Sequence, residues 1–194
     1  PCDDTTRKFL MTRTDKPYEE IAADPGATYE KEIHLDVDAM PFVVARPHQF
    51  GNVCPVDEVA GTRIDQAQIG SCANGRFEDI EIAARMLKGR KVAKGVRFLI
   101  SPASQQVYLQ CLKAGLVEQL IEAGAQVITP GCGVCQPKVG FLSDGEVCIT
   151  ATTRNFKGRK GSQQAEIYLS GPLTVVAAAV AGKIANPREV FNEL

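Results

Sequence analysis

The chain has 194 residues, a hydrophobic content of 44% and a charged content of 23%. This length and composition fit a folded domain with a substantial core and exclude an intrinsically disordered chain. The formal net charge of −1 gives no electrostatic reason to expect nucleic acid or an anionic membrane as a partner. The longest apolar stretch, residues 175–182, is too short to span a bilayer, and no secretory signal pattern opens the chain.

The sequence contains seven cysteines, an odd number without the spacing of a small disulfide-rich scaffold. This usage favours a reducing compartment, so we expect a cytoplasmic protein whose thiols bind metal or lie buried. Four of the cysteines stand outside any metal-binding pattern and are expected to be a free terminal thiol and small core residues. These four are Cys2, Cys54, Cys111 and Cys148.

The first part of the chain carries weak signals for regular structure. Residues 18–23 are compatible with a short helix, and the period-two alternation of residues 32–37 predicts a half-exposed strand. Three prolines make residues 41–56 an extended connector. Neither His34 nor His48 has a neighbouring serine, cysteine or carboxylate pattern typical of a catalytic base, so both are expected to be solvated.

Strand-like and helix-like segments alternate through the rest of the chain, which predicts a largely parallel sheet covered by helices on both faces. We therefore expect residues 61–194 to form an α/β domain, a three-layer αβα sandwich, with residues 1–60 as an extension and connector packing on it. The expected strands are residues 64–69, 96–100, 125–128, 147–152 and 167–170. The expected helices are residues 77–88, 103–114, 116–123 and 173–181, with a last turn at 187–193.

Three cysteines form the most informative candidate site. Cys72 lies in residues 69–76 (IGSCANGR), and Cys132 and Cys135 form a C-x-x-C pair about sixty residues later. Each motif follows a strand-like run, and open α/β sheets build their sites at strand ends. Two thiolates two residues apart, with a third from another loop, suit zinc or an iron–sulfur cluster. Three ligands leave one coordination position open, which a catalytic metal needs.

A second candidate site is the loop at residues 154–159 (RNFKGR), directly after an expected strand. Arg154 and Arg159 could each bind a carboxylate through two parallel hydrogen bonds. On charge alone an exposed basic loop is the alternative, because Lys157 and Lys160 add two further charges. The nearby cysteines favour the first interpretation if the substrate is a polycarboxylate bound at a metal.

Together these motifs resemble the aconitase and isopropylmalate isomerase hydro-lyases. The resemblance rests on residues 69–76, on the cysteine loop at 130–135 (PGCGVC) and on the arginine loop at 154–159, which occur in family order and spacing. It covers the chain from about Tyr29 to Val190. The first motif and the cysteine loop are most similar to those of archaeal-type 3-isopropylmalate dehydratase large subunits.

The resemblance implies a [4Fe–4S] cluster held by Cys72, Cys132 and Cys135, whose fourth iron binds the substrate hydroxyl and acts as a Lewis acid. It also implies carboxylate contacts from the two arginines of the loop and a position for Asn74 in the substrate site. The implied activity is the isomerisation of 2-isopropylmalate and 3-isopropylmalate by dehydration and rehydration, a step of leucine biosynthesis. No catalytic acid or base is expected in this chain.

The chain departs from the family pattern at two positions and lacks other parts of it. Ala73 stands where threonine is common, and Thr153 replaces an asparagine, which could weaken hydrogen bonding around the cluster or substrate. The family's large subunit is longer and carries upstream histidine and acidic motifs, and its serine base lies on a swivelling domain, a separate small subunit in the isomerase branch. We therefore expect the chain to need both partners and to be inactive alone.

Two alternatives remain open at this point. A homoaconitase, or a dehydratase of another substituted malate, would carry the same motifs. A structural zinc-binding domain with Cys111 or Cys148 as the fourth ligand belongs to a different class, and the sequence offers no second C-x-x-C pair to support it.

Overall fold

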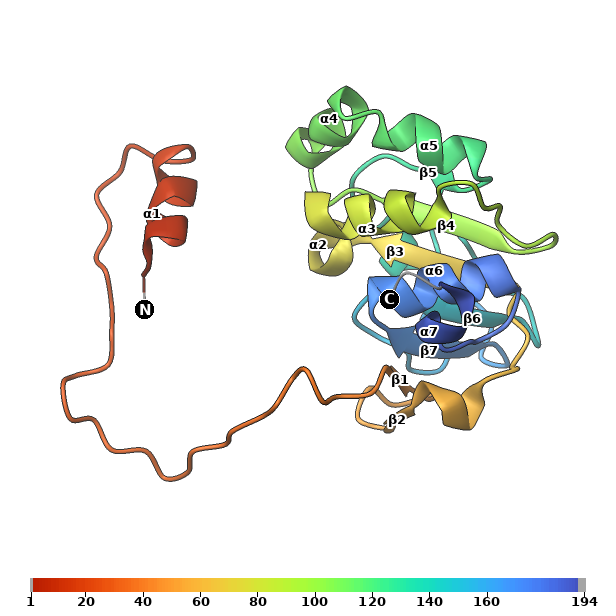
Figure 1. Ribbon diagram of the computed structural model, residues 1–194, viewed down its shortest axis with the longest axis horizontal. Helices are drawn as coiled ribbons and strands as arrows, with labels where there is room; N and C mark the ends of the chain where they lie inside the picture. The colour runs from red at the N-terminus through yellow and green to blue at the C-terminus, as the bar shows by residue number, and fades with distance from the viewer. Residues whose placement is uncertain (1, 192–194) are drawn as a thin grey trace. The chain divides into compact units, whose positions relative to one another are not determined.

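The computed structural model describes residues 2–191, and the chain divides into two compact units, Pro1–Met40 and Pro41–Leu194. The second unit is built on a seven-stranded sheet with the strand order β2-β1-β7-β6-β3-β4-β5 (Figure 1). Strands β7, β6, β3, β4 and β5 are parallel, whereas β1 pairs antiparallel with both β2 and β7. The strands are β1 Val43–Ala45, β2 Val53–Pro55, β3 Gln66–Gly70, β4 Arg97–Ser101, β5 Gln126–Val127, β6 Val147–Thr150 and β7 Glu166–Ser170.

The helices of this unit pack on one face of the sheet. Helices α3 and α6 contact β3 and each other, α5 packs beside α3, α4 packs on α3 and α5, and α7 packs on α6. The helices are α2 Ser71–Asn74, α3 Phe77–Leu87, α4 Gln105–Lys113, α5 Leu116–Glu122, α6 Pro172–Ala181 and α7 Pro187–Val190, with 3-10 turns η1 Val56–Val59 and η2 Gly133–Cys135.

Local sequence explains where these helices begin and which side they bury. In α3 the residues at helical spacing, among them Ile80, Ala83 and Leu87, are buried against the sheet. Asp79 accepts a hydrogen bond from the backbone N–H of Arg76 at 3.0 Å, which satisfies an amide at the start of the helix. Ser104 caps the N-terminus of α4, because its hydroxyl accepts a hydrogen bond from the Val107 N–H.

The two faces of β3 differ in chemistry because side chains alternate along a strand. Ala67 and Ile69 enter the main hydrophobic core beneath the helices. Gln66 and Gln68 are also fully buried, on the opposite face, where the loops after β5 and β6 cover the sheet. Glutamines on a covered sheet face need partners, and the Gln66 amide donates to the carbonyl of Gly140 at 2.9 Å.

The structure confirms the α/β class and the mainly parallel sheet. In the described residues, however, the layer opposite the helices consists of loops and the short η2 rather than the expected helices. The two compact units divide after Met40. The reason is that β1 and β2, in the stretch expected to be a connector, pair with each other and with β7 and extend the sheet.

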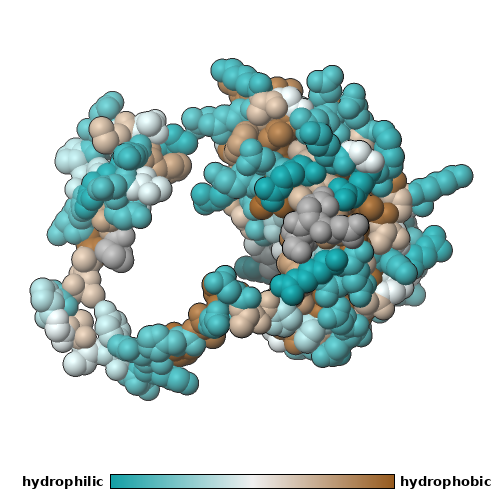
Figure 2. Space-filling model, in the orientation of Figure 1, coloured by the Kyte–Doolittle hydropathy of each residue, from teal (hydrophilic) through white to brown (hydrophobic). Residues whose placement is uncertain are grey.

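Among the described residues of the N-terminal unit there is one helix, α1 Asp4–Met11, where the sequence predicts none. Asp3 caps the N-terminus of this helix, because its carboxylate accepts a hydrogen bond from the Thr6 N–H at 2.7 Å. The helix expected at residues 18–23 and the strand expected at residues 32–37 are absent from the structure. Apolar side chains of the latter stretch are exposed, as the hydrophobic colour along the N-terminal stretch in Figure 2 illustrates. Without a neighbouring strand, the backbone of residues 32–37 cannot form the inter-strand hydrogen bonds that stabilise a strand.

Helix α6 is the most apolar helix but has only ten residues. Among the residues that the structure describes, no helix combines the length and hydropathy that crossing a lipid bilayer requires. The face of the second unit seen in Figure 2 is mostly hydrophilic, with scattered hydrophobic side chains.

A bidentate ion pair joins β4 to the start of β6 and makes stability depend on pH. The Arg97 guanidinium donates to both Glu146 carboxylate oxygens, at 2.8 and 2.9 Å, and this hydrogen bonding lowers the pKa of Glu146 below its usual 4.5. Because the folded carboxyl binds its proton more weakly than the unfolded one, the stabilisation is present above about pH 4.5 and is lost as pH falls through the folded pKa.

Replacing Glu146 by glutamine should therefore lower the free energy of unfolding at pH 7 by roughly 1 kcal/mol, because the pair is partly exposed and screened by solvent. In the same variant, the free energy of unfolding should decrease less steeply as pH falls below about 4.5. Denaturant titrations at several pH values would measure both effects, with exposed Glu81→Gln as the control. An unchanged pH profile would contradict the assignment.

Candidate functional site

The candidate site lies at the carboxyl edge of the parallel strands. The Cys72 segment follows β3, the C-x-x-C segment follows β5, and the arginine loop follows β6. Strands β5, β4, β3 and β6 are neighbours and run parallel, so all three segments leave the sheet at the same edge. The fold thus brings together segments that are far apart in the sequence, at the edge where open α/β sheets bind ligands.

The Cys72 segment makes a tight turn that requires its glycines. Gly70 has a φ of +129°, and a Cβ at that position would lie 2.1 Å from the carbonyl oxygen of Ser101 at the end of β4. A Cβ at Gly75 would lie 2.4 Å from the same oxygen. Ser71, between them, also has a positive φ of 59°. Backbone conformations of this kind persist only where the surroundings impose them, and they are frequent at functional sites.

The C-x-x-C pair forms a single 3-10 turn anchored by Val134. The Cys135 N–H donates to the Cys132 carbonyl at 3.1 Å, and Val134 is fully buried against Leu99. Cys132 is exposed, whereas Cys135 is only 8% exposed. The apolar anchor sets which of the two thiols faces the interior.

The structure places the two cysteine segments in contact. Helix α2 touches η2, and the Ser71 hydroxyl lies 2.9 Å from the Cys135 sulfur. All three cysteines are free thiols, with Cys72 and Cys132 exposed. Within residues 2–191, no three His, Cys, Asp or Glu side chains are already arranged to hold a metal ion. Three soft donors on two touching segments nevertheless fit an iron–sulfur group in their chemistry.

The remaining cysteines are placed as expected. Cys54, Cys111 and Cys148 are buried free thiols, and Cys2 is half-buried. Cys111 lies in the main core beneath the helices, and Cys148 lies in a separate core cluster with Leu142 and Ile167. Burial raises the pKa of both thiols. These surroundings argue against either cysteine as the fourth ligand of a structural zinc site.

Asn74 ties the Cys72 segment to the end of β6. Its side-chain amide donates to the carbonyl oxygen of Ala151 at 2.6 Å. The side chain that the family resemblance assigned to the substrate site therefore also holds the cysteine turn against the neighbouring strand. A replacement at this position would disturb both the turn and any ligand near it.

The arginine loop shows the two predicted arginines in different settings. Arg154 is exposed and donates to the neighbouring Thr153 carbonyl, whereas the guanidinium of half-buried Arg159 lies 5.5 Å from the centre of the Phe156 ring. A cation stacked on an aromatic face is restricted in its direction. Asn155, between the arginines, is buried and donates to the Arg46 carbonyl at 2.9 Å, which joins this loop to the loop after β1.

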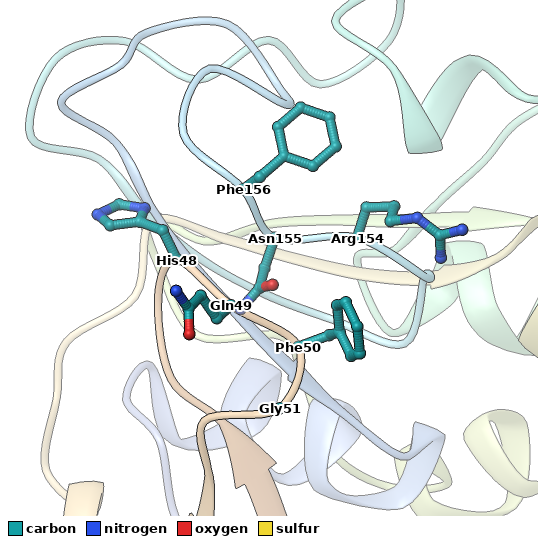
Figure 3. A pocket seen from close by; sticks show the side chains of 7 residues that line it. All are labelled: His48, Gln49, Phe50, Gly51, Arg154, Asn155 and Phe156. Carbon is teal, nitrogen blue, oxygen red and sulfur yellow. The ribbon is translucent and has the colours of Figure 1, made fainter.

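These two loops line an open pocket of about 520 Å³ (Figure 3). Arg154 and Phe156 line it from one side, and His48 and Phe50 line it from the other. The sequence predicts a solvated His48, but the structure shows it half-buried, because the pairing of β1 with β2 places its loop against the arginine loop. Its Nδ1 atom is buried and has no hydrogen-bond partner. His34 is exposed as expected. No pattern in the sequence pointed to this pocket, since it depends on the pairing of β1.

Lys160 also differs from expectation. It was grouped with the exposed basic loop, yet its side chain is 1% exposed and its Nζ donates to the carbonyl of Val134. Burial lowers its pKa, an effect that the neighbouring Cys148 and Cys135 oppose. Lys157, in the same loop, is exposed.

Comparison with known proteins gives consistent relationships over nearly the whole chain. A sequence model of the aconitase family (aconitate hydratase) matches residues 1–182. The chain is 51% identical, over 96% of its length, to 3-isopropylmalate dehydratase large subunit 2 of Archaeoglobus fulgidus, covering 45% of that protein. It is 45% identical, over 98% of its length, to the 3-isopropylmalate dehydratase large subunit of Clostridium kluyveri, covering 46% of it.

A third relative is named "Probable methanogen homoaconitase large subunit", from Methanosarcina mazei. It is 47% identical over 98% of the chain, which covers 48% of it. The chain thus spans about half the length of the curated relatives that it matches.

Proposed function

Because the chain belongs to the aconitase family, we propose that it is the cluster-bearing portion of the large subunit of a [4Fe–4S] hydro-lyase. The proposed reaction interconverts 2-isopropylmalate and 3-isopropylmalate by dehydration and rehydration. The observation that carries this proposal is the contact between the two cysteine segments, with the Ser71 hydroxyl 2.9 Å from the Cys135 sulfur. The parallel strands bring both segments to one edge of the sheet, and this contact then places cysteines that are about sixty residues apart in the sequence on touching segments.

In this proposal Cys72, Cys132 and Cys135 hold the cluster. When bound, the cluster supplies a Lewis acid that stabilises the negative charge on the departing hydroxide. Arg154 and Arg159 hold the substrate carboxylates, and charge-assisted bonds of this kind fix orientation as well as position. The ring of Phe156 limits the directions that Arg159 can take. Asn74 keeps the cysteine turn against β6, beside the bound substrate.

The proposed enzyme is assembled from several parts. The rest of the large subunit and a small subunit with the swivelling domain would complete the site, so the isolated chain is expected to be inactive. The chain offers cluster ligands and carboxylate contacts, but the acid–base group of the reaction would come from a partner. A cytoplasmic location and a role in leucine biosynthesis belong to the same proposal, and the unpaired cysteine usage supports the location.

A homoaconitase is the second candidate, favoured by the 47% identity to the Methanosarcina mazei relative. Both substrates share a malate-like end, which the arginine loop and the cluster would hold in the same way. They differ in the substituent at the other end, for which no recognition element is assigned in this chain.

Anaerobic reconstitution of the chain with iron and sulfide tests the proposal. We expect a brown protein with the broad visible absorbance of thiolate-to-iron charge transfer. The loaded chain should then be combined with the complementary parts and assayed with isopropylmalate and homocitrate-type substrates in parallel. A colourless protein that binds zinc alone would contradict the cluster, and turnover of only the second substrate would select homoaconitase.

A further inference from the structure

Lys160 is the most deeply buried charged side chain among the described residues, with 1% of its surface exposed. Removing an ammonium group from water is strongly unfavourable unless nearby polar groups replace its hydration. A lysine in this environment must therefore be held by specific partners. The partners found in the structure connect it to the cysteine site.

Backbone hydrogen bonds hold the chain on both sides of Lys160. The Leu142 N–H donates to the Lys160 carbonyl at 2.8 Å, and the Ser162 N–H donates to the Leu142 carbonyl at 2.9 Å. Gly161 has a φ of +128°, and a Cβ there would lie 2.6 Å from the Leu142 carbonyl oxygen. This close approach directs the preceding lysine beneath the loop instead of into solvent.

The side chain of Lys160 joins two elements of the candidate site. Its Nζ donates to the Val134 carbonyl at 2.7 Å and to the Thr150 hydroxyl at 3.4 Å. Val134 lies between the two cysteines of the C-x-x-C turn, and Thr150 is the last residue of β6. The lysine thus fastens the cysteine turn to the strand from which the arginine loop departs.

The connection continues to the other cysteine segment. Cys135 follows Val134, and its sulfur lies 2.9 Å from the hydroxyl of Ser71, next to Cys72. On the other side, Lys160 directly follows Arg159. One buried lysine amino group therefore links the loop that carries the arginines to the turn that carries two of the three thiols.

We propose that Lys160 is a positioning residue that holds the C-x-x-C turn in the conformation that receives the iron–sulfur group. The part of this inference that concerns the cluster rests on the proposed function, whereas the restraint on the turn is a property of the chain itself. Without this donor the Val134 carbonyl loses the side chain that fastens the turn to β6, and the turn keeps its apolar anchor, its own backbone hydrogen bonds and the Ser71 contact.

The variant Lys160→Met tests this, because methionine retains an unbranched apolar side chain and removes the donor. Hydrogen exchange of the 194-residue chain should become at least about tenfold faster at the amides of Cys135, Gln136 and Val139, which bond within the turn. Amides of α3 should keep their rates. Lys157→Met, the same change at an exposed lysine of the same loop, should alter none of these rates.

Two further measurements separate positioning from general stability. Alkylation of Cys135, followed by mass spectrometry, should accelerate in Lys160→Met, because this thiol is only 8% exposed. Alkylation of exposed Cys72 should keep its rate, since access does not limit it. Lys160→Arg restores a donor and should bring the exchange of the turn back toward that of the unmodified chain, even if Lys160→Met folds poorly.

After reconstitution, Lys160→Met should lose iron to a chelator at least about tenfold faster than the unmodified chain, in line with the loss of a buried hydrogen bond to the turn. Unchanged exchange in the turn, or exchange accelerated equally throughout the sheet and α3, would overturn the positioning role. Equal iron retention in Lys160→Met and in the unmodified chain would show that Lys160 does not matter for holding the cluster. If the unmodified chain takes up no cluster, the proposed function fails, while the exchange result still decides whether Lys160 restrains the turn.

Discussion

Replacing Cys135 by serine is expected to abolish stable cluster binding, with iron content after anaerobic reconstitution falling from about four atoms per chain to well below one. A serine hydroxyl is a hard, weakly acidic donor and is a poor substitute for a thiolate on iron. Cys135 is also the thiol that touches the second cysteine segment through Ser71, a contact that a serine hydroxyl can retain, so the expected loss of iron reports on the ligand. Iron analysis and visible absorbance measure the effect.

The matched control for this experiment is Cys111→Ser. Cys111 is buried like Cys135 but lies in the core beneath the helices and is not one of the three proposed cluster ligands. Its replacement should reduce the free energy of unfolding, because a hydroxyl in an apolar core lacks partners, while the folded fraction still takes up iron. Full iron content and normal absorbance in Cys135→Ser would remove this cysteine from the proposed ligand set.

Replacing Arg159 by lysine is expected to lower kcat/KM of the assembled enzyme by about ten- to a hundredfold, with iron content unchanged. Lysine retains the charge but cannot make the planar two-pronged contact of a guanidinium with a carboxylate. The loss corresponds to roughly 1.5–3 kcal/mol, typical of a hydrogen bond to a charged group. Lysine would also stack differently on Phe156, so the remaining charge would be less well directed.

Steady-state kinetics with the complementary subunits would measure this effect, and Lys157→Arg is the control. Lys157 is exposed in the same loop, so its conservative replacement should leave kcat/KM within a factor of about two. The two variants should therefore differ in iron content and turnover: Arg159→Lys should retain iron but turn over poorly, and Cys135→Ser should lack a stable cluster. Unchanged kinetics in Arg159→Lys would mean that Arg159 does not bind a substrate carboxylate.

Much of the α/β part of the chain could be predicted because its signals are local. The helix expected at residues 77–88 is observed at Phe77–Leu87, and the strand expected at 96–100 is observed at Arg97–Ser101. In these segments apolar spacing and capping residues agree with the final packing. The last expected turn, at 187–193, is observed as Pro187–Val190, and residues 192 and 193 of the expected turn lie outside the described residues.

The N-terminal expectations depended on partners that periodicity cannot reveal. Residues 32–37 alternate like a strand, but no described neighbour pairs with them, and they remain extended and exposed. Conversely, the short strands β1 and β2 carry little signal between their prolines, and they form because β7 offers an edge to pair with. A strand is stable only in a sheet, so its existence is decided by its neighbours.

By itself the sequence determined most of the order of strands and helices from residue 64 onward, the three cysteines and two arginines worth testing, and the family that their spacing resembles. These are properties of residue type and of distance along the chain. Only the tertiary structure decided that Ser71 meets Cys135, that His48 and Arg154 line one pocket, and that Lys160 is buried beneath the cysteine turn. Burial and contact are set by which segments the sheet brings together at one edge, and no local pattern records that.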